Sequence, residues 1–339
     1  MPTDDTPSTA TLPPPPRKPL QEDCCGHDCA VCVFDLYDQE MRIWAKECEK
    51  LKKATVRQDF YTGKERSSSP PLEPDAYRDF IITAIIFLTT DVVEFHVRSK
   101  VQSTQLLSVG LGQHVVIRVT EENDISKDQS VFSRQLTPYE VDEDDASFKL
   151  MIKLKPNGRL ASAVQRWKTG DEISLRGPFG SLLYKRNRFN KILMLSMGVG
   201  MAPLLSFVRK ILDDEEEDTE IFFHHGSRFY EDICHKDKLD QWTSFWNFHA
   251  VFYLSGESPV RLAARKRYGE TVYPSRLNSS YVEKICSAAD GSEPFCDKDA
   301  AFIVGTPEFE STLAKVLMQN FQGQVFRFTN LLTPNGIRC

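Results

Sequence analysis

The apolar pattern of the chain changes after Arg188, and this change constrains the fold more than any other feature. From Ala76 to about Tyr184, β-branched and aromatic runs alternate with turn residues: "DFIITAIIFLTTDVVEFHVRS", "GQHVVIRVTE", "SFKLMIKLK" and "GDEISLRGPFGSLLY". Short strands at this spacing predict a small antiparallel barrel. After Arg188, apolar strands alternate with helical segments, beginning with "KILMLSM" and "LLSFVRKIL". This alternation predicts a doubly wound parallel sheet, so the expected fold is a two-domain α+β protein.

Composition divides the rest of the 339-residue chain. The Pro-rich stretch "LPPPPRKP" predicts a disordered tail over residues 1–20. A Cys-rich segment follows over 21–62, and its apolar residues have helical spacing from Phe34 onward. We assign a linker, the β-barrel domain, the α/β domain and a C-terminal tail to residues 63–75, 76–187, 188–330 and 331–339.

The net charge and the lengths of the apolar runs exclude some classes of function. The net charge of -6 argues against nucleic acid as a general partner, because neutralising phosphates requires a basic surface. No apolar run reaches the roughly 18 residues that a transmembrane helix needs, and the N-terminus lacks a signal-peptide core. We therefore expect a cytoplasmic protein without a transmembrane segment. In that compartment, nine cysteines indicate thiols or metal ligands rather than disulfides.

Glycine-bearing turns follow two of the apolar strands. Gly198 and Gly200 follow "KILMLSM", and Gly305 follows "AAFIV" with Thr306 and Pro307 behind it. Each turn could simply pack a helix against the sheet. Such turns also bring ligand pyrophosphate close to backbone N–H groups. Because the carboxyl ends of parallel strands meet at one edge, the two turns together indicate a single crevice for a dinucleotide.

The barrel carries a second set of candidates. Arg134 and Thr137 stand at the end of a strand, and Gly158 precedes a predicted helix from Leu160 to Trp167. An arginine fork suits a diphosphate, and backbone donors at a helix start suit the same anion. Taken singly, each residue has a plain structural explanation as a surface arginine or a turn glycine.

The order of these motifs resembles the ferredoxin-NADP reductase-like superfamily, and within it the NADH-cytochrome b5 reductase family, especially its reductase-like branch. The motifs R-x-x-T-P, a glycine turn before a helix, "GDEISLRGPFG", G-x-G-x-x-P and G-T-P occur in that order over residues 76–328. The head "DCCGHDCAVCVFDLY" is similar to a separate oxidoreductase-like N-terminal domain, with Cys24, Cys25, Cys29 and Cys32 as its cysteines.

The resemblance implies an FAD-binding barrel and an NADH-binding α/β domain. The cofactor-binding positions that it implies are Arg134, Gln135, Leu136, Thr137, Met151, Lys153, Gly158, Arg159, Leu160, Ala161, Ser162, Gly198, Gly200, Ala202, Pro203, Gly305, Thr306 and Pro307. This chain departs from the family motifs at several of them. Leu136 replaces an aromatic tyrosine, Val199 and Ala202 replace threonines, and Val304 replaces a cysteine.

The resemblance also implies hydride transfer from NADH to FAD, followed by electron delivery to a haem protein such as cytochrome b5. Thr137 and His114 correspond to the family's proton relay, although His114 on an apolar strand is equally well explained as a structural histidine. Hydride transfer is chemistry of the cofactors, so no departure removes an essential acid or base. A degenerate scaffold of the same fold is the alternative from another class of function.

The choice between NADH and NADPH and the role of the head cysteines stay open. Ser227 and Arg228 follow the second parallel strand, where an arginine is compatible with the 2′-phosphate of NADPH, whereas overall similarity favours NADH. The head cysteines have spacing that could ligate zinc or an iron–sulfur centre, but Cys24 and Cys25 are adjacent and no second C-x-x-C pair follows. Thiols without metal are the preferred interpretation, and we assign no metal ligand.

Overall fold

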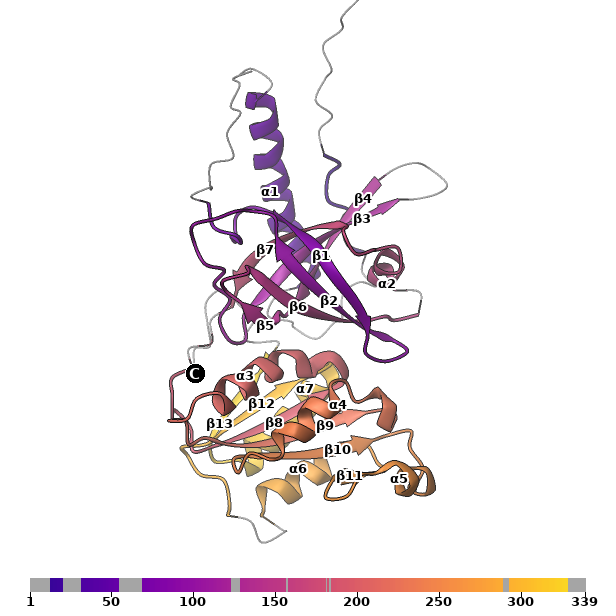
Figure 1. The fold of residues 1–339 in the computed structure, drawn as a ribbon, viewed down its shortest axis with the longest axis vertical. Helices are drawn as coiled ribbons and strands as arrows, with labels where there is room; N and C mark the ends of the chain where they lie inside the picture. Colours follow the sequence, from indigo (N-terminus) through magenta and orange to yellow (C-terminus); the bar gives the residue numbers. More distant parts are fainter. Residues whose placement is uncertain are drawn as a thin grey trace, which may run out of the picture.

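The computed structural model describes residues 13–20, 32–54, 69–122, 129–156, 158–180, 182, 184–288 and 293–328. It has an antiparallel domain and a parallel α/β domain stacked along the long axis, with helix α1 standing beside the first of them (Figure 1). The fold class predicted from the sequence is confirmed.

The barrel domain is a seven-stranded antiparallel sheet in the order β4-β3-β7-β1-β2-β6-β5. Its strands are β1 (Arg78–Phe87), β2 (Val92–Ser99), β3 (His114–Glu122), β4 (Gln129–Leu136), β5 (Tyr139–Asp142), β6 (Ser147–Lys153) and β7 (Glu172–Phe179). Helix α2 (Arg159–Val164) follows β6. Alternating β-branched and aromatic side chains, among them Phe80, Phe95 and Ile117, fill one core inside the curled sheet.

The α/β domain is a six-stranded parallel sheet in the order β11-β10-β9-β8-β12-β13. Its strands are β8 (Lys191–Met197), β9 (Glu220–Ser227), β10 (Phe248–Leu254), β11 (Thr271–Tyr273), β12 (Ala300–Val304) and β13 (Gln324–Arg327). Its helices are α3 (Ala202–Leu212), α4 (Lys236–Trp242), α5 (Pro259–Arg265), α6 (Ser279–Cys286) and α7 (Pro307–Asn320). The chain leaves β8 toward β9 on one side, while β12 pairs with β8 on the other. The strand order therefore reverses at β8, where ligands bind in sheets of this kind.

Helix α1 (Val33–Ala54) packs against the barrel domain. Its Leu36 and Ile43 are buried, and the Trp44 indole donates a hydrogen bond to the carbonyl of Pro13 at 2.8 Å. Pro16 forms a bridge with Val131 on β4. The prediction of a disordered tail is therefore wrong for residues 13–20, because this extended segment pairs with the edge strand of the sheet. Residues 1–12 lie outside the described part of the chain.

Several predicted boundaries moved. The linker predicted over 63–75 ends in packed structure, since Leu72 is buried and the Glu73 carbonyl accepts a hydrogen bond from the N–H of Gly177 at 3.0 Å. Helix α2 ends at Val164 rather than Trp167. Strands β11 and β13 were not predicted, because three or four residues are too short to show a period. The predicted tail over 331–339 lies outside the described residues.

The basic segment around the start of β8 (Tyr184–Lys191) is paired with the acidic run after α3 (Asp213–Asp218). Arg186 forms ion pairs with Asp214 and Glu216, and the Asn187 side chain donates to the Glu216 carbonyl at 2.9 Å. The acidic run is thus a partner for the connection between the domains. Within the described ranges, no helix combines the length and apolar character needed to cross a membrane.

Candidate active site between the two domains

One large cleft, about 950 Å³ in volume, lies between the barrel domain and the α/β domain. Thirteen of the residues predicted from the sequence line it: His114, Gln135, Leu136, Thr137, Met151 and Lys153 from the barrel, and Gly198, Gly200, Ala202, Pro203, Gly305, Thr306 and Pro307 from the α/β domain. The two motif sets, far apart in the sequence, therefore open onto the same space. A cavity of this size and mixed apolar and polar lining suits a large organic cofactor.

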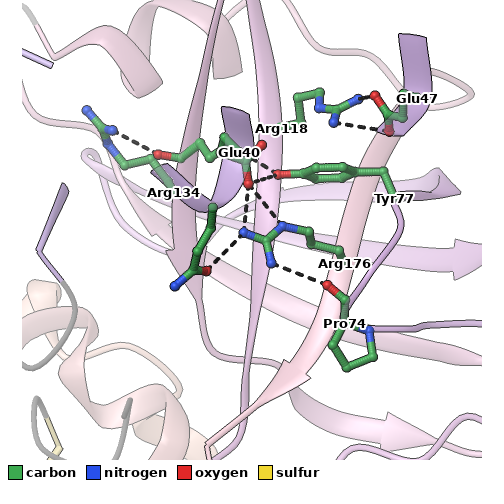
Figure 2. A network of polar contacts seen from close by, with 9 residues as sticks. Glu40, Glu47, Pro74, Tyr77, Arg118, Arg134 and Arg176 are labelled. Carbon is green, nitrogen blue, oxygen red and sulfur yellow. Dashed lines mark hydrogen bonds and ion pairs between the residues drawn. The ribbon is translucent and has the colours of Figure 1, made fainter. Parts of the chain in front are cut away.

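Arg134 and Arg159 do not line this cleft. Both guanidinium groups lie over the Phe132 ring, at 4.9 Å and 4.5 Å from its centroid, beside a separate small hollow. The same hollow is lined by Arg17 and by Tyr37 of α1. Arg134 also donates from Nη1 to the Ser133 carbonyl at 2.9 Å, which holds its side chain along its own strand (Figure 2). The diphosphate-binding role of Arg134 stays a prediction.

Apart from Arg159, the predicted residues of the turn that begins α2 (Gly158, Leu160, Ala161 and Ser162) line neither space. Leu160 packs against the barrel core, and Ala161 is buried. The Ser162 hydroxyl donates to the Gly158 carbonyl at 3.3 Å, inside its own helix. The predicted cofactor contacts of these four residues are therefore not brought into the cleft by this structure.

The glycines of the two turns are required for different reasons. A Cβ atom on Gly200 would lie 2.7 Å from the carbonyl oxygen of Val304, and one on Gly305 would lie 2.6 Å from the Phe309 ring. Gly200 lets the turn after β8 touch the end of β12, whereas Gly305 leaves room for the Phe309 ring of α7. Gly198 instead has φ +55 with open space around its Cβ position. Packing thus explains Gly200 and Gly305, while backbone conformation explains Gly198.

His114 is a buried imidazole at the cleft wall. Its residue is 2% exposed, and Nδ1 has no hydrogen-bond partner among the described residues. Burial, and next the positive charge of Arg176, lower the pKa of His114 to about 4. The ring is therefore neutral at pH 7. An unpaired buried nitrogen on a residue that lines the cleft fits a site that is completed by a ligand or water.

A polar relay fixes the hydroxyl of Ser227 at the opposite wall. Ser196 Oγ lies 2.8 Å from His225 Nδ1, and His225 Nε2 lies 3.0 Å from Ser227 Oγ. Burial lowers the pKa of His225 to about 4, so this ring is neutral as well. Ser227, Arg228 and Arg276 all line the cleft. Sequence reasoning missed His225 and Arg276, although the alternation of "EIFFHHGSR" placed His225 on the same strand as Ser227.

Sequence reasoning also missed Cys234 and Phe328 at the cleft. Phe328 follows β13, a strand too short to predict. Burial, and next the carboxylate of Asp91, raise the pKa of the Cys234 thiol to about 12, so it stays protonated at pH 7. These two residues add to the apolar surface of the site.

The Cys-rich head is only partly described. Cys24, Cys25 and Cys29 fall outside the described residues, whereas Cys32 is a half-buried free thiol directly before α1. Its N–H donates to the Asp35 carboxylate at 3.2 Å. In the ranges that the structure covers, no three His, Cys, Asp or Glu side chains are grouped to hold a metal ion.

Comparison with known families agrees with this geometry. Residues 79–184 match the oxidoreductase FAD-binding domain, and residues 194–315 match the oxidoreductase NAD-binding domain. Residues 9–53 match the N-terminal domain of oxidoreductase-like proteins. The matched domains occur in the same order as in proteins named NADH-cytochrome b5 reductase-like, to which the chain is similar. Its FAD-binding and NAD-binding domains therefore face each other across the cleft.

Individual relatives cover nearly the whole chain. The chain is 29% identical over 317 residues to the NADH-cytochrome b5 reductase-like protein of Homo sapiens, covering 93% of this chain and 94% of the relative. The Mus musculus protein of that name is 29% identical over 89% of this chain and 91% of its own length. The cytochrome b5 reductase domain of Ulva prolifera nitrate reductase is 19% identical and shares the fold, with a TM-score of 0.62 over 76% of this chain and 100% of that chain.

Proposed function

We propose that this protein transfers a hydride from NADH to FAD and then passes electrons to an acceptor such as cytochrome b5. The observation that carries the proposal is the shared cleft, in which Thr137 of the FAD-binding domain and Gly198 and Gly305 of the NAD-binding domain line one space. The names of the human and mouse relatives support NADH and cytochrome b5 as the reaction partners.

FAD, when bound, would accept a hydride at its ring system and release electrons one at a time. The chain would bind it through Leu136, Thr137, Met151 and Lys153, and Lys153 is held by an ion pair with Asp91 at 3.0 Å. The turns after β8 and β12 would position the nicotinamide. The apolar part of the lining would limit water around the bound rings, which favours direct hydride transfer. Neutral His114 would hold a proton on one ring nitrogen near Thr137.

The test uses purified full-length protein incubated with FAD and freed of unbound cofactor. We expect the visible absorption bands of bound flavin, and their bleaching when NADH is added without oxygen. Bound flavin that neither NADH nor NADPH bleaches would contradict the proposal. A colourless preparation would instead favour the degenerate scaffold.

NADPH is a second candidate donor, since Arg228 and Arg276 line the cleft beside Ser227. Two guanidinium groups next to a hydroxyl suit a 2′-phosphate. Parallel titrations with NADH and NADPH distinguish the two, and a preference for NADPH that is lost in Arg276→Ala would assign the phosphate contact. The cytoplasmic location expected from the sequence stays a prediction, to be tested by fractionation.

A further inference from the structure

Helix α1 inserts a carboxylate into the FAD-binding domain. Figure 2 shows Glu40 of α1 facing Arg176 of β7. Glu40 Oε1 accepts from Arg176 Nε at 2.9 Å and from Nη2 at 2.7 Å, and the Tyr77 hydroxyl donates to the same oxygen at 2.8 Å. Glu40 is 3% exposed and Arg176 2%. The two charges therefore form a buried ion pair between the head and the barrel.

Among the described residues, Glu40 is the only acidic side chain with a contact to the Arg176 guanidinium. The other acceptors are neutral: the Gln39 side-chain oxygen at 3.5 Å and the Pro74 carbonyl at 3.4 Å. The second Glu40 oxygen, Oε2, is buried without a hydrogen-bond partner in the described part of the chain. A buried pair with an unsatisfied oxygen is weak support for stability. Stability alone therefore does not explain this pair, and a role at the cleft between the domains is the alternative explanation.

Arg176 lies next to the wall of the cleft. Its guanidinium carbon is 4.9 Å from the centroid of the Phe179 ring, and the His114 ring is 5.5 Å from that same ring. His114 and Phe179 are paired across β3 and β7, as are Val116 and Arg176. The positive charge of Arg176 accordingly contributes to the lowered pKa of His114.

We propose that Glu40 is a positioning residue of the flavin site, which neutralises Arg176 and so sets the electrostatic potential at His114 and at the bound flavin. Glu40 comes from the head as the family match bounds it, residues 9–53, and so lies outside the matched FAD-binding domain at residues 79–184. The head would then contribute to the flavin site through the Glu40 carboxylate. The flavin readout below rests on the proposed function, whereas the histidine readout does not.

A matched control lies on the same helix. Glu47 of α1 forms a two-point ion pair with Arg118, at 3.1 Å and 3.2 Å, and both side chains are partly exposed (Figure 2). Arg118 stacks over the Tyr77 ring at 3.7 Å and does not line the cleft. Glu40→Gln and Glu47→Gln therefore remove the same charge from the same helix at different places.

The first measurement is the equilibrium of the bound flavin against a redox dye. Glu40→Gln keeps the size and an acceptor oxygen but leaves Arg176 unneutralised, which favours reduced flavin because that form carries more negative charge. We expect the ratio of reduced to oxidised flavin at a fixed potential to rise about tenfold, the effect of one charge at a separation of the order of 10 Å and an effective dielectric of about 20. Glu47→Gln should change the ratio less than about twofold, because solvent screens exposed charges. Equal ratios in the two variants would overturn the inference.

The second measurement is an NMR titration of His114 in FAD-free protein, using the variant Glu40→Gln/Arg176→Met. This double variant removes both charges, which buried pairs often tolerate, so it remains available if Glu40→Gln does not fold. We expect the His114 pKa to fall below the wild-type value in Glu40→Gln, where Arg176 is left unneutralised, and to recover to the wild-type value or above it in the double variant. We also expect the flavin ratio of the double variant to return to that of the wild type.

Failure of the proposed function and failure of the inference give different results. Protein that binds no FAD contradicts the proposed function, and the histidine titration then decides the inference alone. Flavin-loaded protein in which Glu40→Gln leaves the His114 pKa unchanged, or in which the double variant lowers it, contradicts the inference and leaves the proposed function standing.

Discussion

Gly198 and Gly200 are two positions apart, yet glycine is required at each for a different physical reason. Gly200 has no room for a side chain, because its Cβ would lie 2.7 Å from a backbone oxygen of β12. Gly198 has room but adopts φ +55, which disfavours L-residues. The pattern G-x-G indicates that something approaches the backbone closely. It does not say whether that neighbour is a ligand or another strand.

Alanine substitutions should separate the two causes. Gly200→Ala should cost about 3 kcal/mol of unfolding free energy, because a backbone atom of Val304 must move. Gly198→Ala should cost only about 1 kcal/mol, the penalty of the left-handed conformation. Urea unfolding of the two variants measures the difference. Equal costs would mean that the turn relaxes freely.

At the scale of elements, α1 illustrates what periodicity misses. Apolar spacing from Phe34 predicted the helix, and the structure places it at Val33–Ala54. Nothing in the spacing predicted that Glu40, between the buried Leu36 and Ile43, is buried as well. A carboxylate within an apolar stripe was the available signal, and its partner stands 136 positions away.

Removing the head should therefore destabilise the barrel. A chain that begins at residue 69 lacks Glu40 and leaves Arg176 without its counter-ion, which should lower the free energy of unfolding by about 3–5 kcal/mol. Adding Arg176→Met to the truncated chain should restore part of that loss, because no unpaired charge remains. Thermal unfolding of both chains tests this. An unchanged melting temperature on truncation would show that the head does not support the barrel.

At the scale of the whole molecule, a buried carboxylate joins the two domains. Glu94 of β2 accepts hydrogen bonds from Tyr139 and His96, and it lies 3.0 Å from Nε2 of His235, which precedes α4 in the other domain. Burial opposes ionisation of Glu94, but hydrogen bonds from His235, Tyr139 and His96 outweigh it and hold its pKa below the usual range. The contact joins β2 of the barrel domain to the start of α4.

Glu94→Gln should loosen the contact between the domains at neutral pH. A hydrogen bond to a charged group contributes about 1.5–3 kcal/mol, so we expect faster proteolysis between the domains and an earlier unfolding transition. Because the folded-state pKa of Glu94 is lowered, its stabilisation is present above the unfolded value of 4.5 and is lost as pH falls below it. The gap between wild type and variant in denaturant midpoint should thus shrink in acid. A gap that is constant with pH would contradict the ionic character of the contact.

The sequence by itself determined the change from antiparallel strands to alternating strands and helices, the two glycine turns and the motifs that carry the family resemblance. Each of these is a local pattern, with a period or a spacing of a few residues. Tertiary structure alone decided that Arg134 stacks on Phe132 outside the cleft, that Glu40 neutralises Arg176, and that Glu94 meets His235. The last two pairs join residues that are distant in the chain, while Arg134 follows the packing around Phe132 and α1. The choice among such partners depends on burial and charge balance, which appear only once the layers have packed.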